Sequence, residues 1–324
     1  MTLFFMRATG SIVDAGAGTT GGVKLLAYSA PGTNPANTNL VLGHQPIFVM
    51  GCDRSASEVH WICDSVRGAT KLVNVPTPSA EITDTDSVKS FNADGVTVGP
   101  SQYTNLDSRN YRILSIGADS ILEIVTYTGT GVARTVSHTG NGIGATPASI
   151  WTFPLNITSG AVYHKSLGAT KADFLDDNAA ANTSAIYWDN TAPTGSEFTV
   201  GTSNRVNANG VSYVAYLWYE VAGVSTIDEF VGDASDPGIT ESTGFSPDFM
   251  LFKNPNLARG WLTFDTARNP SNTRNLALRM DVGANESTGF GGYDTVANGV
   301  QMRSTSDWLN PSAAQMIYSA FKVS

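Results

Sequence analysis

A Ser/His/Asp hydrolase needs a histidine as its general base, and the chain offers four: His44, His60, His138 and His164. No Gly-x-Ser-x-Gly sequence is present, although this turn exposes the nucleophile in one large class of hydrolases. His164 lies in a segment that recurs along the chain, where the other copies carry Cys63 and, roughly, Phe264. A position that accepts Cys, His or Phe is typical of a packed strand residue. We therefore predict no catalytic residue and no enzyme activity.

Neighbouring acids are the second group that could do chemistry, because glycoside cleavage needs two carboxyl groups about 5–10 Å apart. The candidate pairs are Asp84 with Asp86, Asp176 with Asp177, and Asp233 with Asp236. All lie in Gly/Thr/Asn-rich loops, where solvated acids are ordinary, so hydrolysis is disfavoured. The segment Asp84–Val88 begins like an EF-hand loop but lacks the glycine and the closing glutamate. We expect no metal and no other cofactor.

Tryptophan side chains can stack on sugar rings when they lie on loops, but they fill cores when they lie on strands. Trp151 and Trp218 lie within apolar runs and are predicted to be core residues. Trp188 and Trp308 lie in the polar segments Tyr187–Asn190 and Ser306–Asn310. These two are our candidates for contact with a glycan.

The two cysteines, Cys52 and Cys63, are eleven residues apart with a predicted turn between them. They could form a cross-strand disulfide if their Cα atoms come within about 7 Å. They could equally remain free thiols that pack as small apolar residues. The sequence leaves both alternatives open, whereas a zinc site would need more ligands at closer spacing.

These residues belong to a pattern that recurs about every hundred positions. The segment Trp61–Lys71 returns as Val162–Lys171 and, more loosely, as Trp261–Arg268. In each copy a proline precedes an apolar run, at Pro46, Pro147 and Pro247, with steps of 101 and 100 residues. Such self-similarity predicts tandem units. We place unit one at residues 1–117, unit two at 118–222 and unit three at 223–324.

Short β-branched and aromatic runs between Gly, Pro, Asn and Asp dominate every unit, and no dozen residues show helical spacing of apolar positions. This pattern predicts an all-β protein of three tandem β-sandwich-like repeats. A three-bladed propeller is less favoured, because propellers typically have four or more blades. The start, Met1–Arg7, is predicted to be a strand and not a signal peptide. No apolar stretch reaches about 18 residues, so no transmembrane helix is expected.

The composition is poor in charged residues and acidic on balance. Charged residues make up 15% of the 324 residues, well below the usual quarter, and the net charge is −9. Because no basic cluster offsets the 28 acids, binding to nucleic acid or to anionic membranes is disfavoured. Ser, Thr, Asn and Gly must supply the polar surface, as in extracellular and virion β-proteins.

An acid and an arginine recur three residues apart, as Asp64 with Arg67 and Asp265 with Arg268. By the 101-residue step, unit two carries Lys165 at the position of the acid. Because unit two loses both charges together, we expect each acid to pair with its arginine and to order the turn. We assign this motif to fold stability. An exposed pair would contribute under about 1 kcal/mol, whereas a buried pair would be costly to break.

Several segments resemble a repeated domain of phage tail fibre and tail-spike-like proteins, often described only as a domain of unknown function. The resemblance is carried by Val162–Lys171, Tyr187–Asn190, Glu197–Gly201, Phe264–Pro270, Ser306–Asn310 and Tyr318–Phe321, and in unit one by Asp64–Lys71 and Phe91–Gly95. It covers about two thirds of the chain well. It implies a virion component in or near the host-adsorption apparatus and implies no catalytic residues.

Three functions follow as hypotheses. The first is a non-enzymatic phage structural protein of the tail fibre or adsorption apparatus, which binds a host surface glycan or a neighbouring virion protein. The second is a capsid or tail decoration or spike protein, and the third is a polysaccharide depolymerase. The resemblance and the low charge also predict a homo-oligomer, with a trimer as first choice, located on the phage particle.

Overall fold

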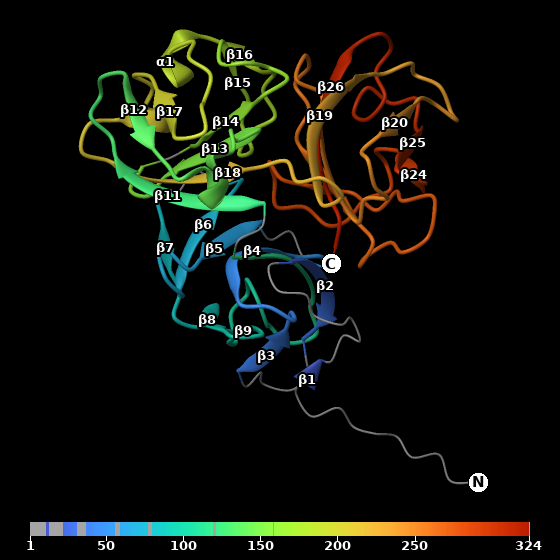
Figure 1. Cartoon of the computed structure of the whole chain (residues 1–324). Coiled ribbons are helices and arrows are strands. Elements are labelled where there is room, and N and C mark those ends of the chain that lie inside the picture. The colour runs from blue at the N-terminus through green and yellow to red at the C-terminus, as the bar shows by residue number, and fades with distance from the viewer. Residues whose placement is uncertain are drawn as a thin grey trace, which may run out of the picture.

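A computed structural model of the chain describes residues 11–12, 22–30, 37–55, 59–76, 80–118, 121–157 and 159–323, and strands dominate these ranges (Figure 1). The prediction of an all-β protein is confirmed. Two helices of one turn each, α1 (Ala185–Trp188) and α2 (Asn204–Asn207), lie in unit two, where Gly140–Gly144 (η1) also forms an irregular turn. The predicted first strand, Met1–Arg7, lies outside the described residues.

Unit one contains a larger sheet in the order β2-β10-β4-β5-β6-β7 and a smaller sheet in the order β1-β3-β9-β8. Its strands are β1 Ser11–Ile12, β2 Val23–Ser29, β3 Thr38–Val41, β4 Pro46–Asp53, β5 Trp61–Asp64, β6 Lys71–Asn74, β7 Ile82–Thr83, β8 Val88–Asn92, β9 Gly95–Val98 and β10 Asn110–Gly117.

Unit two contains the sheet β11-β18-β13-β14 and the pairs β12-β17 and β15-β16. Its strands are β11 Leu122–Thr128, β12 Arg134–Ser137, β13 Ser149–Pro154, β14 Ala161–His164, β15 Lys171–Ala172, β16 Asn182–Thr183, β17 Glu197–Val200 and β18 Ser212–Trp218.

Unit three contains the sheet β19-β26-β21-β22-β23 and the smaller sheet β20-β25-β24. Its strands are β19 Ser225–Val231, β20 Thr240–Ser242, β21 Phe249–Lys253, β22 Leu262–Asp265, β23 Leu278–Arg279, β24 Gly292–Val296, β25 Gly299–Arg303 and β26 Gln315–Phe321.

The same strand order recurs in the three larger sheets. In each one the last long strand of the unit lies between the first strand and the strand that follows the recurring proline. That proline lies two residues before the equivalent strand residues Phe48, Ser149 and Phe249, which pair with Ile116, Trp218 and Phe321 of the last strands. No strand ladder joins two units within the described residues. Close superposition of the whole units stays a prediction.

Each larger sheet is buried on both faces, which explains why its strands read as continuous apolar runs instead of alternating ones. In β10, for example, Tyr111 and Ile113 pack inside unit one, whereas Leu114 and Ile116 point the other way. Units two and three have internal cores of the same kind. A fourth core, here called the central core, takes residues from all three units, including Phe48, Trp218 and Phe321. Figure 1 shows the three lobes arranged around it.

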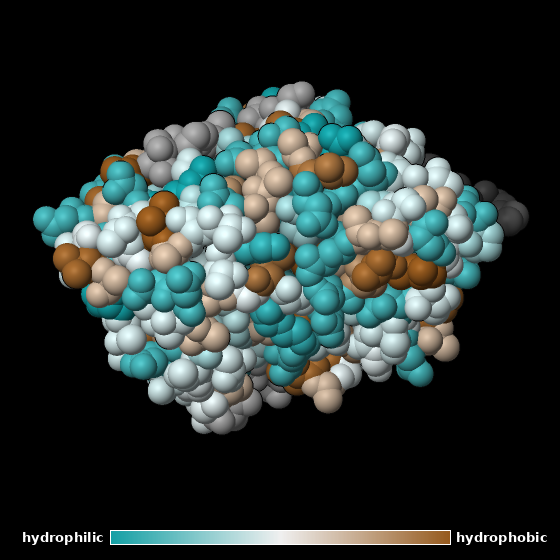
Figure 2. Space-filling model, turned by 90° about the horizontal axis from the view of Figure 1, so that it is seen from above, coloured by the Kyte–Doolittle hydropathy of each residue, from teal (hydrophilic) through white to brown (hydrophobic). Residues whose placement is uncertain are grey.

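The surface fits the low content of charged residues. Seen from above, polar and neutral residues dominate, and apolar residues form small, separate groups (Figure 2). The large apolar side chains exposed on the described residues are Val66, Val132, Ile186, Val231 and Leu257. Among those residues, no helix has the length and apolar character needed to cross a membrane.

Candidate functional site

The recurring turn lies directly after β5, β14 and β22. In the strand pairing, Phe48 faces Asp64, Ser149 faces His164 and Phe249 faces Asp265. The prediction that Lys165 occupies the position of the acid is therefore wrong by one residue, and His164 occupies it. The reason is that the hairpin between β13 and β14 is one residue shorter than its two counterparts.

The turn of unit three contains a fully buried ion pair between Asp265 and Arg268. Arg268 Nε lies 2.5 Å from Asp265 Oδ2, and the backbone N–H of Arg268 donates to Asp265 Oδ1 at 3.0 Å. The remaining guanidinium N–H groups donate to the carbonyls of Thr263 and Leu276 and to Glu286. Burial opposes ionisation of Asp265, but the cations of Arg268 and Arg112 outweigh it and hold the pKa of this carboxyl below its usual value.

The turn of unit one repeats this arrangement. Arg67 Nε lies 2.5 Å from Asp64 Oδ2, and Arg67 also reaches Glu81 at 3.0 Å and the carbonyl of Ile62. The hydroxyl of Tyr216, from unit two, donates to Asp64 at 2.9 Å and accepts from Arg67 at 3.1 Å. The predicted pairing of acid with arginine is present in both turns, and its contribution to stability stays a prediction.

Unit two keeps the turn without a buried pair of acid and arginine. His164 is fully buried, its Nδ1 accepts from the N–H of Ser166 at 3.3 Å, and Leu167 replaces the arginine. Burial lowers the pKa of His164 to about 4, so the ring is neutral at pH 7. All three turns share a backbone hydrogen bond to the carbonyl of Asp64, His164 or Asp265 from the residue four positions later.

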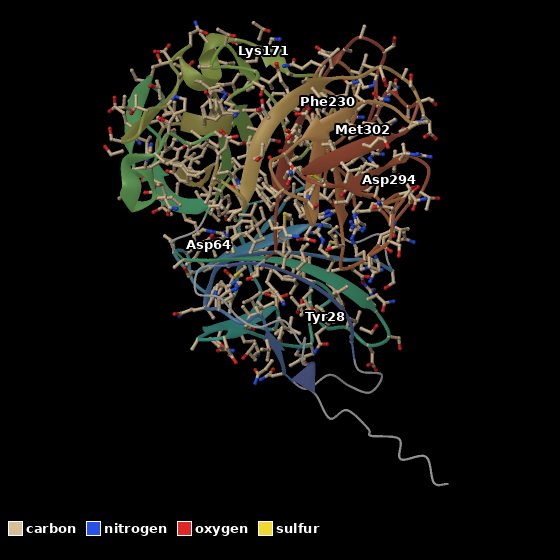
Figure 3. The ribbon with its side chains drawn as sticks, turned by 45° about the vertical axis from the view of Figure 1, so that its right-hand side comes forward. Tyr28, Asp64, Lys171, Phe230, Asp294 and Met302 are labelled. Atoms are coloured by element: carbon tan, nitrogen blue, oxygen red, sulfur yellow. The ribbon has the colours of Figure 1, made fainter. Side chains whose placement is uncertain are left out.

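Each turn contacts the last long strand of the next unit. Asp64 meets Tyr216 of unit two, and His164 Nε2 lies 3.3 Å from the carbonyl oxygen of Tyr318 in unit three. Asp265 Oδ2 lies 3.7 Å from Arg112 Nε in unit one, which closes the cycle. Figure 3 shows Asp64 where the lobes of units one and two meet. The motif therefore forms a ring of three junctions between units.

Sequence reasoning missed the partners that complete these junctions, which are Glu81, Tyr216, Arg112 and Glu286. A second contact supports the closing junction, because Arg54 of unit one pairs with Glu286 at 2.7 Å. None of these residues recurs at the hundred-residue step, so the repeat pattern gave no signal for them.

The other three histidines are also structural. His44 bonds to Ser115 at 2.9 Å, and His138 Nδ1 accepts from the N–H of Gly140. His60 is 1% exposed and lies at the junction of units one and three, where burial and the nearby cations Arg112 and Arg268 lower its pKa well below the usual value. His138 Nδ1 also lies 3.3 Å from the hydroxyl of Tyr219 and 3.7 Å from Glu123. No histidine in the described residues contacts both a Ser or Cys side chain and an acid.

The three candidate carboxylate pairs bind neighbouring side chains. Asp176 and Asp177 both bind Arg205, each at 3.1 Å. Asp84 accepts from the hydroxyl of Ser101 at 2.6 Å, while Asp86 pairs with Lys89. The third pair is similar: Asp233 accepts from the side-chain amide of Asn310, and Asp236 binds Arg303. Within the described residues, no group of three or more His, Cys, Asp or Glu side chains could hold a metal ion.

The structure separates the two tryptophan candidates. The expectation for Trp188 is wrong, because α1 turns its ring into the core of unit two, where it is 1% exposed and packs edge-on to Tyr163. Trp308 is partly exposed, with Phe290 beside it and the guanidinium groups of Arg259 and Arg279 about 5 Å from its ring centre. Glycan contact by Trp308 stays a prediction.

The cysteines are free and buried. Cys63 pairs with Val49 inside unit one, whereas Cys52 pairs with Arg112 and shares the opposite face of the sheet with Phe48 and Met50. The disulfide alternative is therefore excluded. Burial raises the pKa of Cys63 to about 12, which keeps it a protonated thiol.

Comparison with known proteins identifies one family of domains. A family model described as a domain of unknown function (DUF7483) matches residues 24–115 and 103–324, which together span nearly the whole chain. No curated protein matches the sequence. The chain therefore belongs to the DUF7483 family of domains of unknown function.

Proposed function

We propose that the protein is a non-enzymatic structural protein of a bacteriophage particle. In this proposal it serves in the tail fibre or adsorption apparatus and binds a host surface glycan or a neighbouring virion protein. The observation that carries the proposal is the use of the buried charges: the pairs at Asp64 and Asp265, together with His164, join units to one another. A chain whose buried turn residues join three β-sandwiches is suited to be a rigid scaffold that displays loops.

The displayed surface supports a binding role. Charged residues are few, so exposed Ser, Thr and Asn side chains must provide most of the contacts to a partner. Hydroxyl and amide groups on loops of a rigid scaffold give adaptable hydrogen bonding to glycans and to protein surfaces. The resemblance of these repeats to tail fibre domains supports a location on the virion.

A decoration or spike protein is the second candidate, and the same rigid scaffold suits it equally. The depolymerase hypothesis is less favoured, because the three candidate carboxylate pairs bind Arg205, Lys89, Ser101, Asn310 and Arg303 instead of facing a shared cleft.

Assembly into a homo-oligomer remains part of the proposal. The central core already joins three units within one chain, so association must use outer surfaces of the lobes. Analytical ultracentrifugation of the purified protein tests this point. A strict monomer that also fails to attach to the particle would contradict it.

Two experiments test the function. Immunogold electron microscopy of phage particles with an antibody against the purified protein is expected to label the tail, and labelling spread over the head would favour a decoration protein. Purified protein is expected to bind host cells without releasing reducing sugar ends from host polysaccharide. Release of reducing ends, lost in Asp176→Asn or Asp233→Asn variants, would overturn the proposal in favour of a depolymerase.

A further inference from the structure

The junction between units one and two contains a hollow, and its counterpart between units two and three carries long charged side chains at the equivalent positions. In the filled junction, Lys165 follows the turn residue His164 and reaches Glu220 at 2.8 Å and Asp228 at 3.7 Å. Glu220 lies two residues after Trp218, at the end of the last strand of unit two. These three side chains occupy the space between the turn and the first strand of the next unit.

The strand pairing identifies the equivalent residues in the hollow junction. Ser65 follows Asp64 as Lys165 follows His164, and Ala118 lies two residues after Ile116 as Glu220 follows Trp218. Lysine and glutamate are thus replaced by serine and alanine. The two short side chains leave an open hollow of about 190 Å³ between the turn of unit one and β11.

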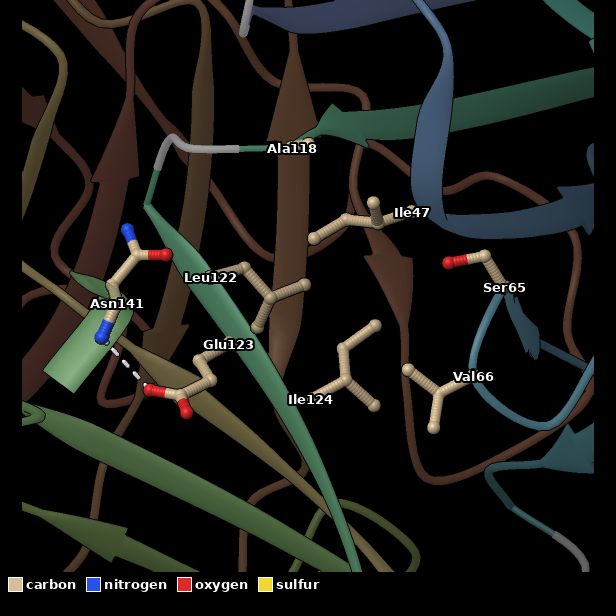
Figure 4. Close-up of a pocket in the computed structure, with 8 residues that line it drawn as sticks. All are labelled: Ile47, Ser65, Val66, Ala118, Leu122, Glu123, Ile124 and Asn141. Atoms are coloured by element: carbon tan, nitrogen blue, oxygen red, sulfur yellow. Dashed lines mark hydrogen bonds between the residues drawn. The ribbon is translucent and has the colours of Figure 1, made fainter. Parts of the chain in front are cut away.

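The walls of the hollow are apolar. Ile47, Leu122, Ile124 and Val66 surround it, and Figure 4 shows these side chains directed into a common space. Leu122 belongs to the central core, and Ile47 and Ile124 pack against it, so the hollow continues the interface between the two units outward. Val66 is 54% exposed, although it is a large apolar residue at the tip of a turn.

Glu123 borders the hollow but is held away from it. Its carboxylate accepts from Thr139 and Asn141 and from the hydroxyl of Tyr219. Burial opposes its ionisation, yet the donated hydrogen bonds lower the pKa of Glu123 below the usual value. Among the residues that the structure describes, no long side chain fills the space, and the bordering acid is satisfied by its hydrogen-bond donors without an added cation.

We propose that this hollow binds one aromatic side chain presented by a partner protein. The volume suits a single ring, since an apolar cavity of about 150 Å³ can hold benzene. A free small molecule would keep much of its surface in water, because Val66, Ser65 and Ala118 are exposed at the mouth. A ring carried by a partner surface removes that mouth from water and covers Val66, as aromatic anchors do at interface centres. This inference goes beyond the proposed function and applies wherever the protein is located.

The test uses p-cresol, the side chain of tyrosine, as the probe. In methyl-labelled protein, p-cresol is expected to shift the NMR signals of Ile47, Leu122 and Ile124 in a saturable manner with millimolar affinity. The variant Ser65→Lys with Ala118→Glu fills the hollow with the pair found in the sister junction, and is expected to weaken binding at least tenfold. Val132→Ser, which changes an exposed valine outside the hollow, is the matched control and is expected to leave binding unchanged.

Three outcomes would overturn the inference. They are equal binding by the filled variant, equal affinity for the aliphatic probe isobutanol, and micromolar affinity for free p-cresol, which would identify a small molecule as the ligand. If the filled variant does not fold, Val66→Ser replaces it, since the sister junction carries Ser166 at that position. Weaker p-cresol binding by Val66→Ser supports the inference, and unchanged binding contradicts it.

Discussion

The turns at Asp265 and His164 share one backbone hydrogen bond, but they bury different side chains. At Asp265 a full negative charge is buried and is matched by the side chains of Arg268 and Arg112 and by the backbone N–H of Arg268. At His164 the side chain is neutral and needs only the N–H of Ser166 and one contact to the next unit. The charge is therefore not required to form the turn. Once it is present, however, every partner becomes necessary, because a buried unpaired charge is far more costly than a missing pair.

The largest expected effect comes from breaking the charged turn. Arg268→Ala leaves the fully buried Asp265 without its main partner and should reduce the free energy of unfolding by about 3–5 kcal/mol. Adding Asp265→Ala removes the stranded charge, so the double variant should lose little more. Urea unfolding of both variants measures this. The control is Lys89→Ala at an exposed pair, which should change stability by less than about 1 kcal/mol. Additive losses would contradict the pairing.

The contribution of the His164 turn to stability should change with pH in a range where the contribution of the Asp265 turn does not. Because the pKa of His164 is about 4 in the folded protein and about 6.5 when unfolded, its contribution is complete above pH 6.5. That contribution, about 3 kcal/mol, is lost as the pH falls from 6.5 to 4. The lowered pKa of Asp265 acts only below its normal value of 3.8. Urea unfolding at pH 7 and 4.5 should show a smaller loss for His164→Gln than for the unmodified protein. Equal losses would exclude the histidine as the cause.

A smaller effect is expected where a neutral group completes the other charged turn. Tyr216→Phe removes the hydroxyl that binds both Asp64 and Arg67 and should reduce stability by about 2 kcal/mol. Tyr103→Phe, which loses only a 3.4 Å contact with Asn74, is the control and should cost less than half as much. Thermal unfolding curves at one pH suffice for the comparison. A Tyr216→Phe protein as stable as the control would show that the junction does not need the hydroxyl.

The smallest effect concerns the filled junction. Lys165→Ser with Glu220→Ala removes a partly exposed ion pair and should change stability by less than about 1 kcal/mol. The same double change should open a second hollow beside β19. NMR titration should then show p-cresol shifts at Ile227, the residue equivalent to Ile124, and their absence would show that chain length at these two positions does not control the hollow.

The sequence allowed the all-β class and the acid–arginine pairs to be predicted, because both depend on local spacing. The register of unit two was missed although a signal existed: Gly68-Ala69-Thr70-Lys71 and Gly168-Ala169-Thr170-Lys171 are 100 residues apart, not 101. That step places His164 opposite Asp64. The 101-residue step between prolines gives the wrong register for the turn of unit two, because the β13–β14 hairpin, which lies between Pro147 and His164, is one residue shorter.

Other features depend on tertiary packing that no local pattern records. Trp188 lies among polar neighbours in sequence, yet Ser184 caps α1 and Asp189 ends it in a left-handed conformation (φ 48°), which directs the ring inward. The partners Arg112 and Tyr216 come from strands about 150 residues away from the groups they bind. The hollow beside Val66 likewise exists only because two units meet there.

The central core has a consequence for how the protein unfolds. Each larger sheet presents one face to the other two units, so the loss of any unit would expose apolar surface on both neighbours. Three independent β-sandwiches joined only by linkers would unfold in separate transitions, whereas these three units should unfold together. Differential scanning calorimetry should therefore give one transition whose calorimetric and van't Hoff enthalpies agree, as for a single small domain. By the same argument, a fragment cut near residue 118 or 223 should aggregate, because the cut leaves half of a shared interior open to water.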